Sequence, residues 1–393
     1  MIQELSQSEV KIFIKEHEND DPADLVLKYA GDKSLPISLI ADQIRARKKA
    51  KSKAPFLYQN PEIIFPKGAS LEQSSSQATA QYKADLIQGT SLTDLTGGFG
   101  IDTYFFAKKC KKVIHVEPNK DLSRLVKHNF KILGIQNVGF KNESAENHLE
   151  NETNSSDCYF IDPSRRGDQN QRVFHLEDCS PNLENLLPNL HRRTANILIK
   201  LSPFIDIRQA LSQIPRVSEV HVLSVRNECK EVLFKSNPNF DQEPKYFAID
   251  INQGDIFSFQ FDQSEEVKPV SYGLPECHLY EPNSSIMKAG GFNSVANKYA
   301  LKKLHRNSHL YTSDELVSDF PGRKFRITKQ VSLSRKKLQQ SIPTNKVNIT
   351  VRNFPETVAE IRKRTGLKEG GEFYLFATTL MDESLVGLLC TKV

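Results

Sequence analysis

Several features that mark other protein classes are missing from this 393-residue chain. It has no run of eighteen apolar residues, so we expect no membrane-spanning helix. Its first residues mix charges throughout, with no basic segment followed by an apolar one, which excludes a typical secretory signal. The six cysteines lie far apart without a C-x-x-C pair, so neither a metal site nor a disulfide framework is expected. Reduced thiols in the cytoplasm are the plain expectation.

The chain does carry an uneven distribution of charge. Its net charge is +5, but residues 321–368 contain thirteen lysines or arginines and two glutamates, a local net charge of +11. The rest of the chain therefore carries −6. A basic segment joined to a mildly acidic body predicts a polyanionic partner.

The order of predicted helices and strands indicates an α/β fold. Residues 1–85 are predicted helical, and Ser70 as N-cap with Gln73 at the capping-box position predicts one helix through Ile87. From residue 92 to 236, five strand–helix steps end in two consecutive strands. This pattern is typical of the seven-stranded, mostly parallel sheet of a Rossmann-like class I methyltransferase domain. A dinucleotide dehydrogenase would have six parallel strands instead.

The last part of the chain is predicted to form a separate α+β region. The segment KYFAIDINQGDIFSFQF predicts a hairpin around Gln253 and Gly254, an extension of the first sheet. Helices are predicted at SVANKYALKKLH and at ETVAEIRKRTG, which ends at Gly366, and four strands are predicted around them. We therefore expect a helical region at 1–88, the methyltransferase domain at 89–272, a small α+β (ferredoxin-like) connecting region at 273–320 and a small basic domain at 321–393.

The strongest local signal is a glycine-rich loop between a predicted strand and a predicted helix. In DLTGGFGID, Gly97, Gly98 and Gly100 let the backbone turn sharply and approach a ligand closely. Asp94 ends the strand, where its carboxylate can bind the cationic amino-acid part of S-adenosylmethionine. Glu117 ends the next strand, where it can accept hydrogen bonds from ribose hydroxyls. NAD is the competing cofactor, but the full G-x-G-x-x-G pattern is missing.

A third turn follows the third predicted strand. There Ser144 or the Ala145 backbone can hold the edge of the adenine, although an ordinary surface turn explains each residue nearly as well. Three further residues lie within the motifs and complete the predicted cofactor site: Thr96, Asp102 and Pro118.

The predicted catalytic loop, Asp162-Pro163-Ser164-Arg165-Arg166, follows the apolar strand CYFI. Open α/β sheets place their chemistry at the carboxyl ends of parallel strands. Asp162 and the Pro163 carbonyl can accept hydrogen bonds from a ring N–H or an exocyclic amine. Arg165 or Arg166 can bind a phosphate or stack on a base, unless nearby acids pair with them. No cysteine adjoins the LSP segment after the next strand, which favours methylation of nitrogen or oxygen over covalent C5 chemistry.

The chain resembles bacterial class I S-adenosylmethionine-dependent methyltransferases with a C-terminal THUMP-like domain. The resemblance covers nearly the whole chain and is carried by EQSSSQATAQYKADLI, DLTGGFGID, VEPN, DPSRRGDQNQRVF, KLSPFIDI, LYEPNSSIMKAG, FPGRKFRI and VRNFPETVAEIRKR. It implies that the carboxylates and glycines named above bind the cofactor and that residues 162–166 form the catalytic loop. It also implies that residues 72–79, including Gln73 and Thr79, cap the cofactor pocket. The loop departs from the D/N-P-P-Y/F/W motif of amino-methylating enzymes, because Ser164 and Arg165 replace its last two residues.

A THUMP-like domain suggests RNA as the partner, by analogy with RNA-binding THUMP domains. Contacts from its cations would be mainly to phosphate. Phe325, Phe354 and Tyr374 are expected to fill the core of this domain. The predicted RNA contacts are Arg323, Lys324, Arg326, Arg335, Lys336, Lys337, Arg352, Arg362, Lys363 and Arg364.

The sequence therefore predicts a methyltransferase that uses S-adenosylmethionine to modify a base nitrogen of tRNA or rRNA. Two alternatives stay open at this point. One is a methyltransferase acting on a protein or small molecule, and the other is a non-catalytic RNA-binding protein.

Overall fold

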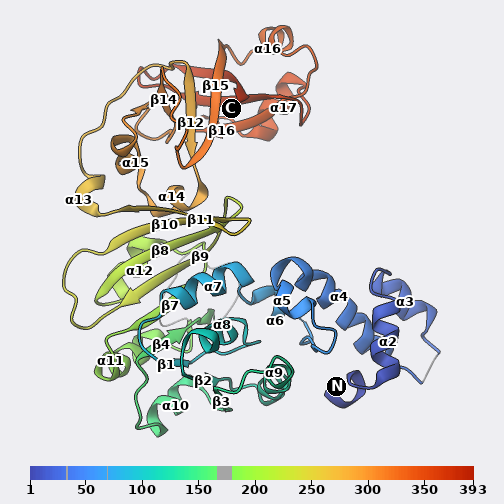
Figure 1. Ribbon diagram of the computed structural model, residues 1–393. Helices are drawn as coiled ribbons and strands as arrows, with labels where there is room; N and C mark the ends of the chain where they lie inside the picture. Colours follow the sequence, from blue (N-terminus) through green and yellow to red (C-terminus); the bar gives the residue numbers. More distant parts are fainter. Residues whose placement is uncertain (32–33, 69, 166–178) are drawn as a thin grey trace. The chain divides into compact units, whose positions relative to one another are not determined.

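The computed structural model describes residues 1–31, 34–68, 70–165 and 179–393 of the chain. Arg166 of the predicted catalytic loop lies outside the described residues. The chain forms two compact units, whose elements are labelled in Figure 1. The first consists of Met1–Glu219 with Glu231–Gln242, and the second of Val220–Lys230 with Glu243–Val393.

The predicted helical region precedes the first strand. Its helices are α1 (Ile2–Leu5), α2 (Ser8–Glu16), α3 (Pro22–Lys28), α4 (Ile37–Lys53), α5 (Pro55–Tyr58), α6 (Ser70–Gln73) and α7 (Gln77–Asp85). Apolar side chains from this region share one hydrophobic core with residues of α8 and α9 in the domain that follows. The helical region is therefore packed onto the α/β core and is not a loose extension.

The predicted single helix starting at Ser70 is wrong, because residues 74–76 separate α6 from α7. Ser76 is the N-cap of α7, and its hydroxyl accepts a hydrogen bond from the Thr79 backbone N–H at 3.2 Å. Serine side chains compete for backbone hydrogen bonds in this way, so three consecutive serines interrupt a helix.

The predicted α/β core is confirmed. The strands are β1 (Ser91–Asp94), β2 (Lys112–Val116), β3 (Val138–Lys141), β4 (Cys158–Ile161), β7 (Ile197–Leu201), β8 (Val217–Val225) and β9 (Glu228–Ser236). Their order is β3-β2-β1-β4-β7-β9-β8, with the first five parallel and β9 antiparallel to β7. All residues of β4 and β7 are buried, as expected for central strands covered on both faces.

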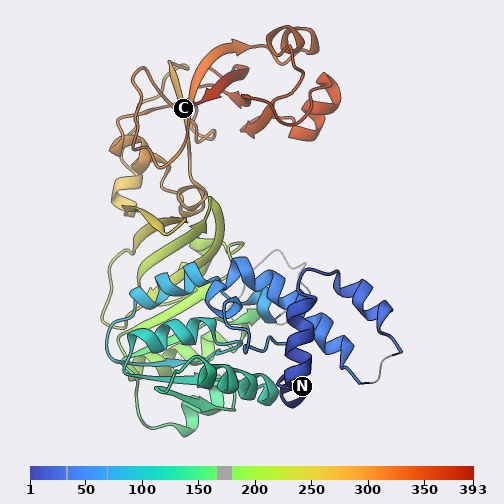
Figure 2. The same ribbon diagram turned by 45° about the vertical axis from the view of Figure 1, so that its right-hand side comes forward.

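Helices alternate with these strands: α8 (Ile101–Lys109), α9 (Lys120–Ile132), α10 (Ala145–Asn151), α11 (Leu183–Arg193) and α12 (Ile207–Gln213). In Figure 1, α9 lies to the right of β2 and β3, and the turned view of Figure 2 brings this side of the sheet forward. Because the five core strands are parallel, their carboxyl ends meet at one edge of the sheet, where the predicted site residues gather.

The predicted hairpin after this core is confirmed as β10 (Lys245–Asn252) and β11 (Asp255–Phe261). Its turn consists of Gln253 and Gly254, with φ of 52° and 99°. Two positive φ angles are typical of tight hairpin turns that match the twist of the strands.

The remainder of the second unit is built on a second sheet with the order β13-β14-β12-β15-β18-β17-β16. Its strands are β12 (His278–Pro282), β13 (Lys302–Lys303), β14 (Tyr311–Ser313), β15 (Gly322–Val331), β16 (Asn348–Arg352), β17 (Phe373–Thr379) and β18 (Leu385–Lys392). Its helices are α13 (Gln263–Glu266), α14 (Ser284–Ala289), α15 (Phe292–Lys298), α16 (Arg335–Ser341) and α17 (Val358–Thr365). The expected α+β architecture is thus confirmed, and α17 ends at Gly366, as predicted.

The predicted helix SVANKYALKKLH is wrong in its second half. α15 ends at Lys298, and Ala300 has a φ of 51°, which an L-residue does not adopt within a right-handed helix. The two lysines after Leu301 form β13 instead. The short helix α16 was not predicted from the sequence.

Asn129 of α9 connects the helical region to the α/β core. Its buried side-chain amide donates to the Ile64 carbonyl at 2.8 Å and accepts from the Ile64 N–H at 3.2 Å. Replacing Asn129 by Ala leaves both backbone groups buried without a partner, and we expect a loss of about 2–4 kcal/mol in the free energy of unfolding. Urea denaturation measures this change. The matched control, Asn147→Ala at an exposed position, should change it by less than about 0.5 kcal/mol, and equal effects would contradict the prediction.

Candidate active site

The loop between β1 and α8 is shaped by its glycines. A Cβ atom at Gly97 would lie 2.2 Å from the ring of His115, and one at Gly100 would lie 2.7 Å from a methyl group of Val126. Gly98 and Gly100 have positive φ angles of 52° and 80°. The Gly97 N–H donates to the Val116 carbonyl at 2.9 Å, which holds the loop against the end of β2. Larger residues could not adopt this path.

Asp94 lies buried at the carboxyl end of β1. Its carboxylate accepts a hydrogen bond from the Thr96 N–H at 3.1 Å and one from the Thr103 hydroxyl at 2.6 Å. Burial, opposed by these hydrogen bonds, raises the pKa of Asp94 to about 7. The carboxylate is therefore close to half protonated at neutral pH, so its charge responds strongly to a nearby cation.

His115 supports this arrangement from β2. Its Nδ1 atom lies 3.0 Å from the Thr103 hydroxyl, and burial lowers the pKa of His115 to about 3, so the ring is neutral. Because Thr103 donates its one hydroxyl proton to Asp94, the Nδ1–H of His115 donates to Thr103. The two hydrogen bonds that link His115 to Thr103 and Thr103 to Asp94 fix the position of the Asp94 carboxylate.

Glu117 lies directly after β2, beside the glycine loop. One carboxylate oxygen accepts from the Gly98 N–H at 3.0 Å and the other from the Asn119 N–H at 2.8 Å. Burial is the main cause of a raised pKa for Glu117. Each oxygen retains a lone pair that can accept a further hydrogen bond.

The turn after β3 is tied to the same region. The Asn142 side chain donates to the carbonyls of Glu117 at 2.8 Å and Pro118 at 3.0 Å. Ser144 is the N-cap of α10, because its hydroxyl accepts from the Asn147 N–H at 3.2 Å, and Ala145 is buried. Asn142 is a positioning residue that the sequence analysis did not single out.

Asp162 follows β4 and is linked directly to the glycine loop. Its backbone N–H donates to the Thr96 hydroxyl at 2.7 Å. Its carboxylate forms an ion pair with Lys200 at the end of the neighbouring strand β7. Burial acts to lower the pKa of Lys200, but the charges of nearby carboxylates, Asp162 first among them, outweigh burial and raise it. Lys200 therefore stays protonated and holds the Asp162 carboxylate in place.

Lys83 of α7 is fully buried, with an exposed fraction of 0%. Its Nζ lies 2.7 Å from Glu231 of β9, 3.0 Å from Asp102 of α8 and 2.7 Å from the Ser75 hydroxyl. The Ser75 hydroxyl also donates to Asp102 at 2.6 Å. Asp102 thus interacts with protein groups, and Lys83 joins three elements that are distant in the sequence.

These residues form one group with an excess of carboxylates. The charges of Asp102 and Asp162 both help to raise the pKa of Asp94. Those of Glu231 and Asp102 both help to raise the pKa of Lys200. The group contains two lysines and four carboxylates: Lys83, Lys200, Asp94, Asp102, Asp162 and Glu231. Three carboxylates pair with a lysine, whereas Asp94 pairs with none in the described part of the chain. The site therefore favours a positively charged ligand.

The rest of the catalytic loop forms a short strand pair, β5 (Ser164–Arg165) with β6 (Cys179–Ser180). The Ser164 hydroxyl donates to the Ser180 carbonyl at 3.3 Å, and Pro163 is partly exposed. Cys179 lies in the strand paired with the loop but is buried, which does not favour it as a nucleophile.

Of the two residues predicted to cap the cofactor pocket, Gln73 is the last residue of α6. Thr79 is buried in α7, and its hydroxyl donates to the Ser76 carbonyl at 3.2 Å. The lysines Lys83 and Lys200 and the acid Glu231 were missed. A lysine inside the buried strand ILIKL was the available signal for Lys200.

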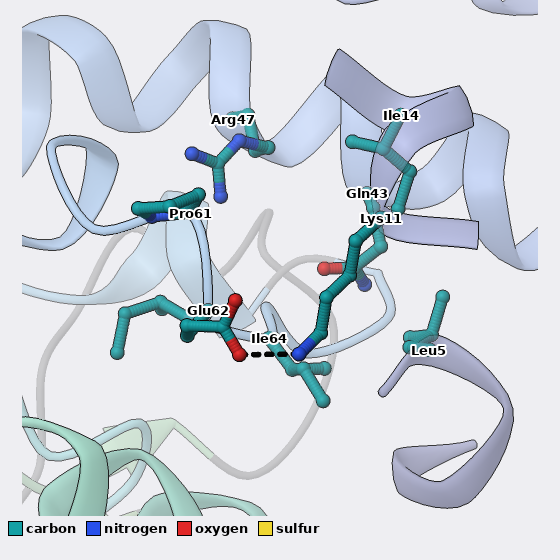
Figure 3. A pocket seen from close by; sticks show the side chains of 9 residues that line it. Leu5, Lys11, Ile14, Gln43, Arg47, Pro61, Glu62 and Ile64 are labelled. Atoms are coloured by element: carbon teal, nitrogen blue, oxygen red, sulfur yellow. Dashed lines mark hydrogen bonds and ion pairs between the residues drawn. The ribbon is translucent and has the colours of Figure 1, made fainter. Parts of the chain in front are cut away.

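A small pocket lies elsewhere, among the N-terminal helices (Figure 3). Lys11 and Glu62 form an ion pair beside it, and Arg47 donates to the Tyr58 carbonyl at 2.9 Å. The residues lining it include none of those predicted for cofactor or catalysis. Within the described ranges, no His, Cys, Asp or Glu group suits a metal ion, and no helix has the length and apolar character to cross a bilayer.

The ten predicted RNA contacts fall into two groups. Arg323 and Arg352 both pair with buried Glu281, Arg362 pairs with Glu369, and Arg364 pairs with Glu356. Lys324 donates to the Ser318 carbonyl. The other five are exposed: Arg326, Arg335, Lys336, Lys337 and Lys363. Phe325 is buried, and Phe354 and Tyr374 pack against the cores of the domain, as expected.

The strand order and the glycine loop define a class I methyltransferase fold. Comparison with family models finds a ferredoxin-like domain at residues 278–321 and a THUMP-like domain at residues 322–392. A solved structure of a candidate methyltransferase from Porphyromonas gingivalis W83 is 32% identical, covers 98% of this chain and 97% of its own, and has a TM-score of 0.87. The chain belongs to this family of class I methyltransferases with a C-terminal THUMP-like domain.

Two more distant structures share lower similarity. An rRNA methylase from Streptococcus thermophilus is 15% identical over 41% of this chain and 94% of its own, with a TM-score of 0.30. A candidate methyltransferase from Streptococcus mutans in complex with SAH is 12% identical over 40% of this chain and 96% of its own, also with a TM-score of 0.30. A comparison with curated proteins finds no match.

Lys83 offers a direct test of the buried charge group. Lys83→Met leaves Asp102 and Glu231 buried without their cation, and we expect a loss of about 3–5 kcal/mol in the free energy of unfolding. Thermal and urea denaturation measure this loss. Lys112→Met, at an exposed position of β2, is the control and should change stability by less than about 0.5 kcal/mol. A tolerated Lys83→Met would mean that the two carboxylates do not depend on this lysine.

Proposed function

We propose that this chain uses S-adenosylmethionine to methylate a base nitrogen of tRNA or rRNA. The observation that carries the proposal is the 2.7 Å hydrogen bond from the Asp162 N–H to Thr96. It joins a carboxylate able to accept a proton to the loop that would hold the cofactor. The exposed cations of the second unit and its THUMP-like match support RNA as the polyanionic acceptor.

The residues at the sheet edge fit a cationic cofactor with a nucleoside part. Asp94 would bind the ammonium of its amino-acid part, and Glu117 would accept hydrogen bonds from the ribose hydroxyls. Ser144 and Ala145 would border the adenine. A Cβ at Gly98 would lie 3.8 Å from the nearest atom outside its two neighbours, the Thr96 carbonyl oxygen, so the loop leaves room for a ligand there. Bound there, S-adenosylmethionine would supply an electrophilic methyl group.

Asp162 would act on the acceptor. A nitrogen that gains a methyl group must lose a proton, and Asp162 accepts it or the hydrogen bond that leads to its loss. Lys200 fixes the Asp162 carboxylate through the ion pair, and the bond to Thr96 sets its distance from the cofactor loop. The Pro163 carbonyl accepts a second hydrogen bond from an exocyclic amine.

Cofactor affinity should depend on pH through Asp94. The pKa of Asp94 is about 7 in the free protein, and a bound cation favours the ionised form, so binding releases a proton. Affinity is therefore expected to rise by up to about tenfold per pH unit below pH 7 and to level off above about pH 8. Calorimetric titration in buffers of different ionisation enthalpy measures the release. Asp94→Asn should bind weakly and without proton release, and release that persists in this variant would contradict the assignment.

Asp162 should affect turnover and not cofactor binding. We expect Asp162→Asn to lower kcat by about 10²–10⁴-fold, because the proton acceptor is lost. The affinity for S-adenosylmethionine should stay within about threefold of the original, as measured by calorimetry. Full activity in this variant would refute the role of Asp162.

RNA binding should depend on the exposed cations for which the described part of the chain shows no internal ion pair. Replacing Arg335, Lys336, Lys337 and Lys363 together by Glu should weaken RNA binding and reduce its salt dependence by about one phosphate contact per residue lost. Filter binding at several salt concentrations measures both. The control carries the same reversals at four exposed cations of the first unit, Lys112, Arg124, Lys127 and Lys131. Equal loss in the two variants would argue for a non-specific charge effect.

Transfer of labelled methyl from S-adenosylmethionine into total RNA from cells lacking this protein tests the proposal as a whole. Nucleoside mass spectrometry should find one labelled methylnucleoside. Cofactor binding without label in RNA would overturn the choice of RNA and point to a protein or small-molecule acceptor.

A further inference from the structure

The turn after β7 carries an aromatic side chain that the mechanism above does not use. Phe204 is 88% exposed. Its backbone is nevertheless anchored: the Phe204 N–H donates to the Ser202 hydroxyl at 3.4 Å, and the Ile205 N–H donates to the Ser202 carbonyl at 3.1 Å. Ile205 is buried, and Asp206 caps α12 by accepting from the Gln209 N–H at 2.9 Å. The ring is thus held outward by a turn that is fixed on both sides.

The turn that carries Phe204 lies at the same edge of the sheet as Asp162. Ile199 of β7 pairs with Ile161 of β4, so Lys200 and Asp162 leave the sheet side by side, and their side chains form an ion pair. Phe204 follows Lys200 by four residues, a span of at most about 14 Å even for an extended chain. The ring therefore lies at the same edge of the sheet as the proposed proton acceptor.

The chemistry at this edge calls for a flat, apolar surface. A base presented to Asp162 must be held by its face as well as by its edge, and unpaired bases commonly stack on aromatic side chains. The catalytic loop supplies none, because Ser164 and Arg165 stand where amino-methylating enzymes have proline and an aromatic. An exposed cation, Arg208, lies four residues beyond Phe204 and suits a neighbouring phosphate.

We infer that Phe204 stacks on the unpaired nucleobase that Asp162 acts on. This role rests on the proposed function and adds to it that the target base is unpaired when it is methylated. It makes Phe204 a substrate-binding residue that does not take part in holding the cofactor.

Kinetic comparison of three variants tests this role. Phe204→Ala should lower kcat/KM for labelled methyl transfer to RNA by about 10–100-fold, as expected for the loss of one stacked base, and leave cofactor affinity unchanged within about twofold. Phe204→Tyr should restore most of the activity, because its ring stacks equally well. Val267→Ala, at another exposed apolar position, is the control and should match the original protein. An unaffected Phe204→Ala overturns the inference, as does failure of Phe204→Tyr to recover.

A spectroscopic test needs no turnover, because the chain contains no tryptophan. Phe204→Trp therefore introduces a single tryptophan at the proposed stacking position, and its emission can be excited apart from that of the eleven tyrosines. Single-stranded oligoribonucleotides should quench its emission at saturation, whereas a fully paired RNA duplex should not. Val267→Trp reports any quenching unrelated to stacking. No quenching by single strands, or equal quenching of both variants, overturns the inference.

The two tests separate failure of the inference from failure of the proposed function. If the original protein labels RNA and Phe204→Ala labels it equally well, RNA methylation stands and stacking by Phe204 falls. If the original protein labels no RNA and Phe204→Trp is not quenched, both fall. Quenching by single strands without label in RNA supports base stacking and overturns only the methylation of RNA.

Discussion

The active edge of the sheet depends on placing four carboxylates beside two lysines, with Asp94 and Glu231 buried and Asp102 and Asp162 partly exposed. Isolated carboxylates are costly to bury, and each of three here has a lysine within ion-pair distance: Asp102 and Glu231 have Lys83, and Asp162 has Lys200. Asp94 has hydrogen bonds but no lysine partner in the described part of the chain, and burial raises its pKa to about 7. The fold thus leaves one buried carboxylate whose environment suits a cationic ligand.

The local parts of this arrangement could be predicted from the sequence. Strand–helix alternation determines the sheet, and the hairpin at Gln253 and Gly254 follows from turn chemistry within a few residues. Asp94 and Glu117 could be proposed from the sequence, because Asp94 ends the strand before a glycine-rich loop and Glu117 comes at the end of the next strand. The pair formed by Lys83 and Glu231 was not predicted, because these two residues are 148 positions apart and neither lies in a recognisable local motif. Lys200 meets Asp162 only through the pairing of β7 with β4.

The errors also have a physical cause in particular residues. The helix from Ser70 is interrupted by serines that cap the next helix, and α15 ends before Ala300, whose backbone is left-handed. In the basic domain, the sequence correctly predicted an excess of cations, but it did not show which of them form ion pairs within the protein. Four arginines there pair with glutamates of the same unit, so fewer cations are left for a polyanionic partner than the sequence implied.

By our proposal, separate residues of this chain do what a single motif does in amino-methylating enzymes. The motif combines a carboxylate or amide, prolines that shape the loop and an aromatic that stacks on the base. Here the carboxylate is Asp162, and its position is set by Thr96 and Lys200 from two other strand ends. The aromatic contact falls, by our proposal, to Phe204 in the next loop. Because both loops leave adjacent parallel strands, the sheet itself keeps the acceptor and the stacking ring in register.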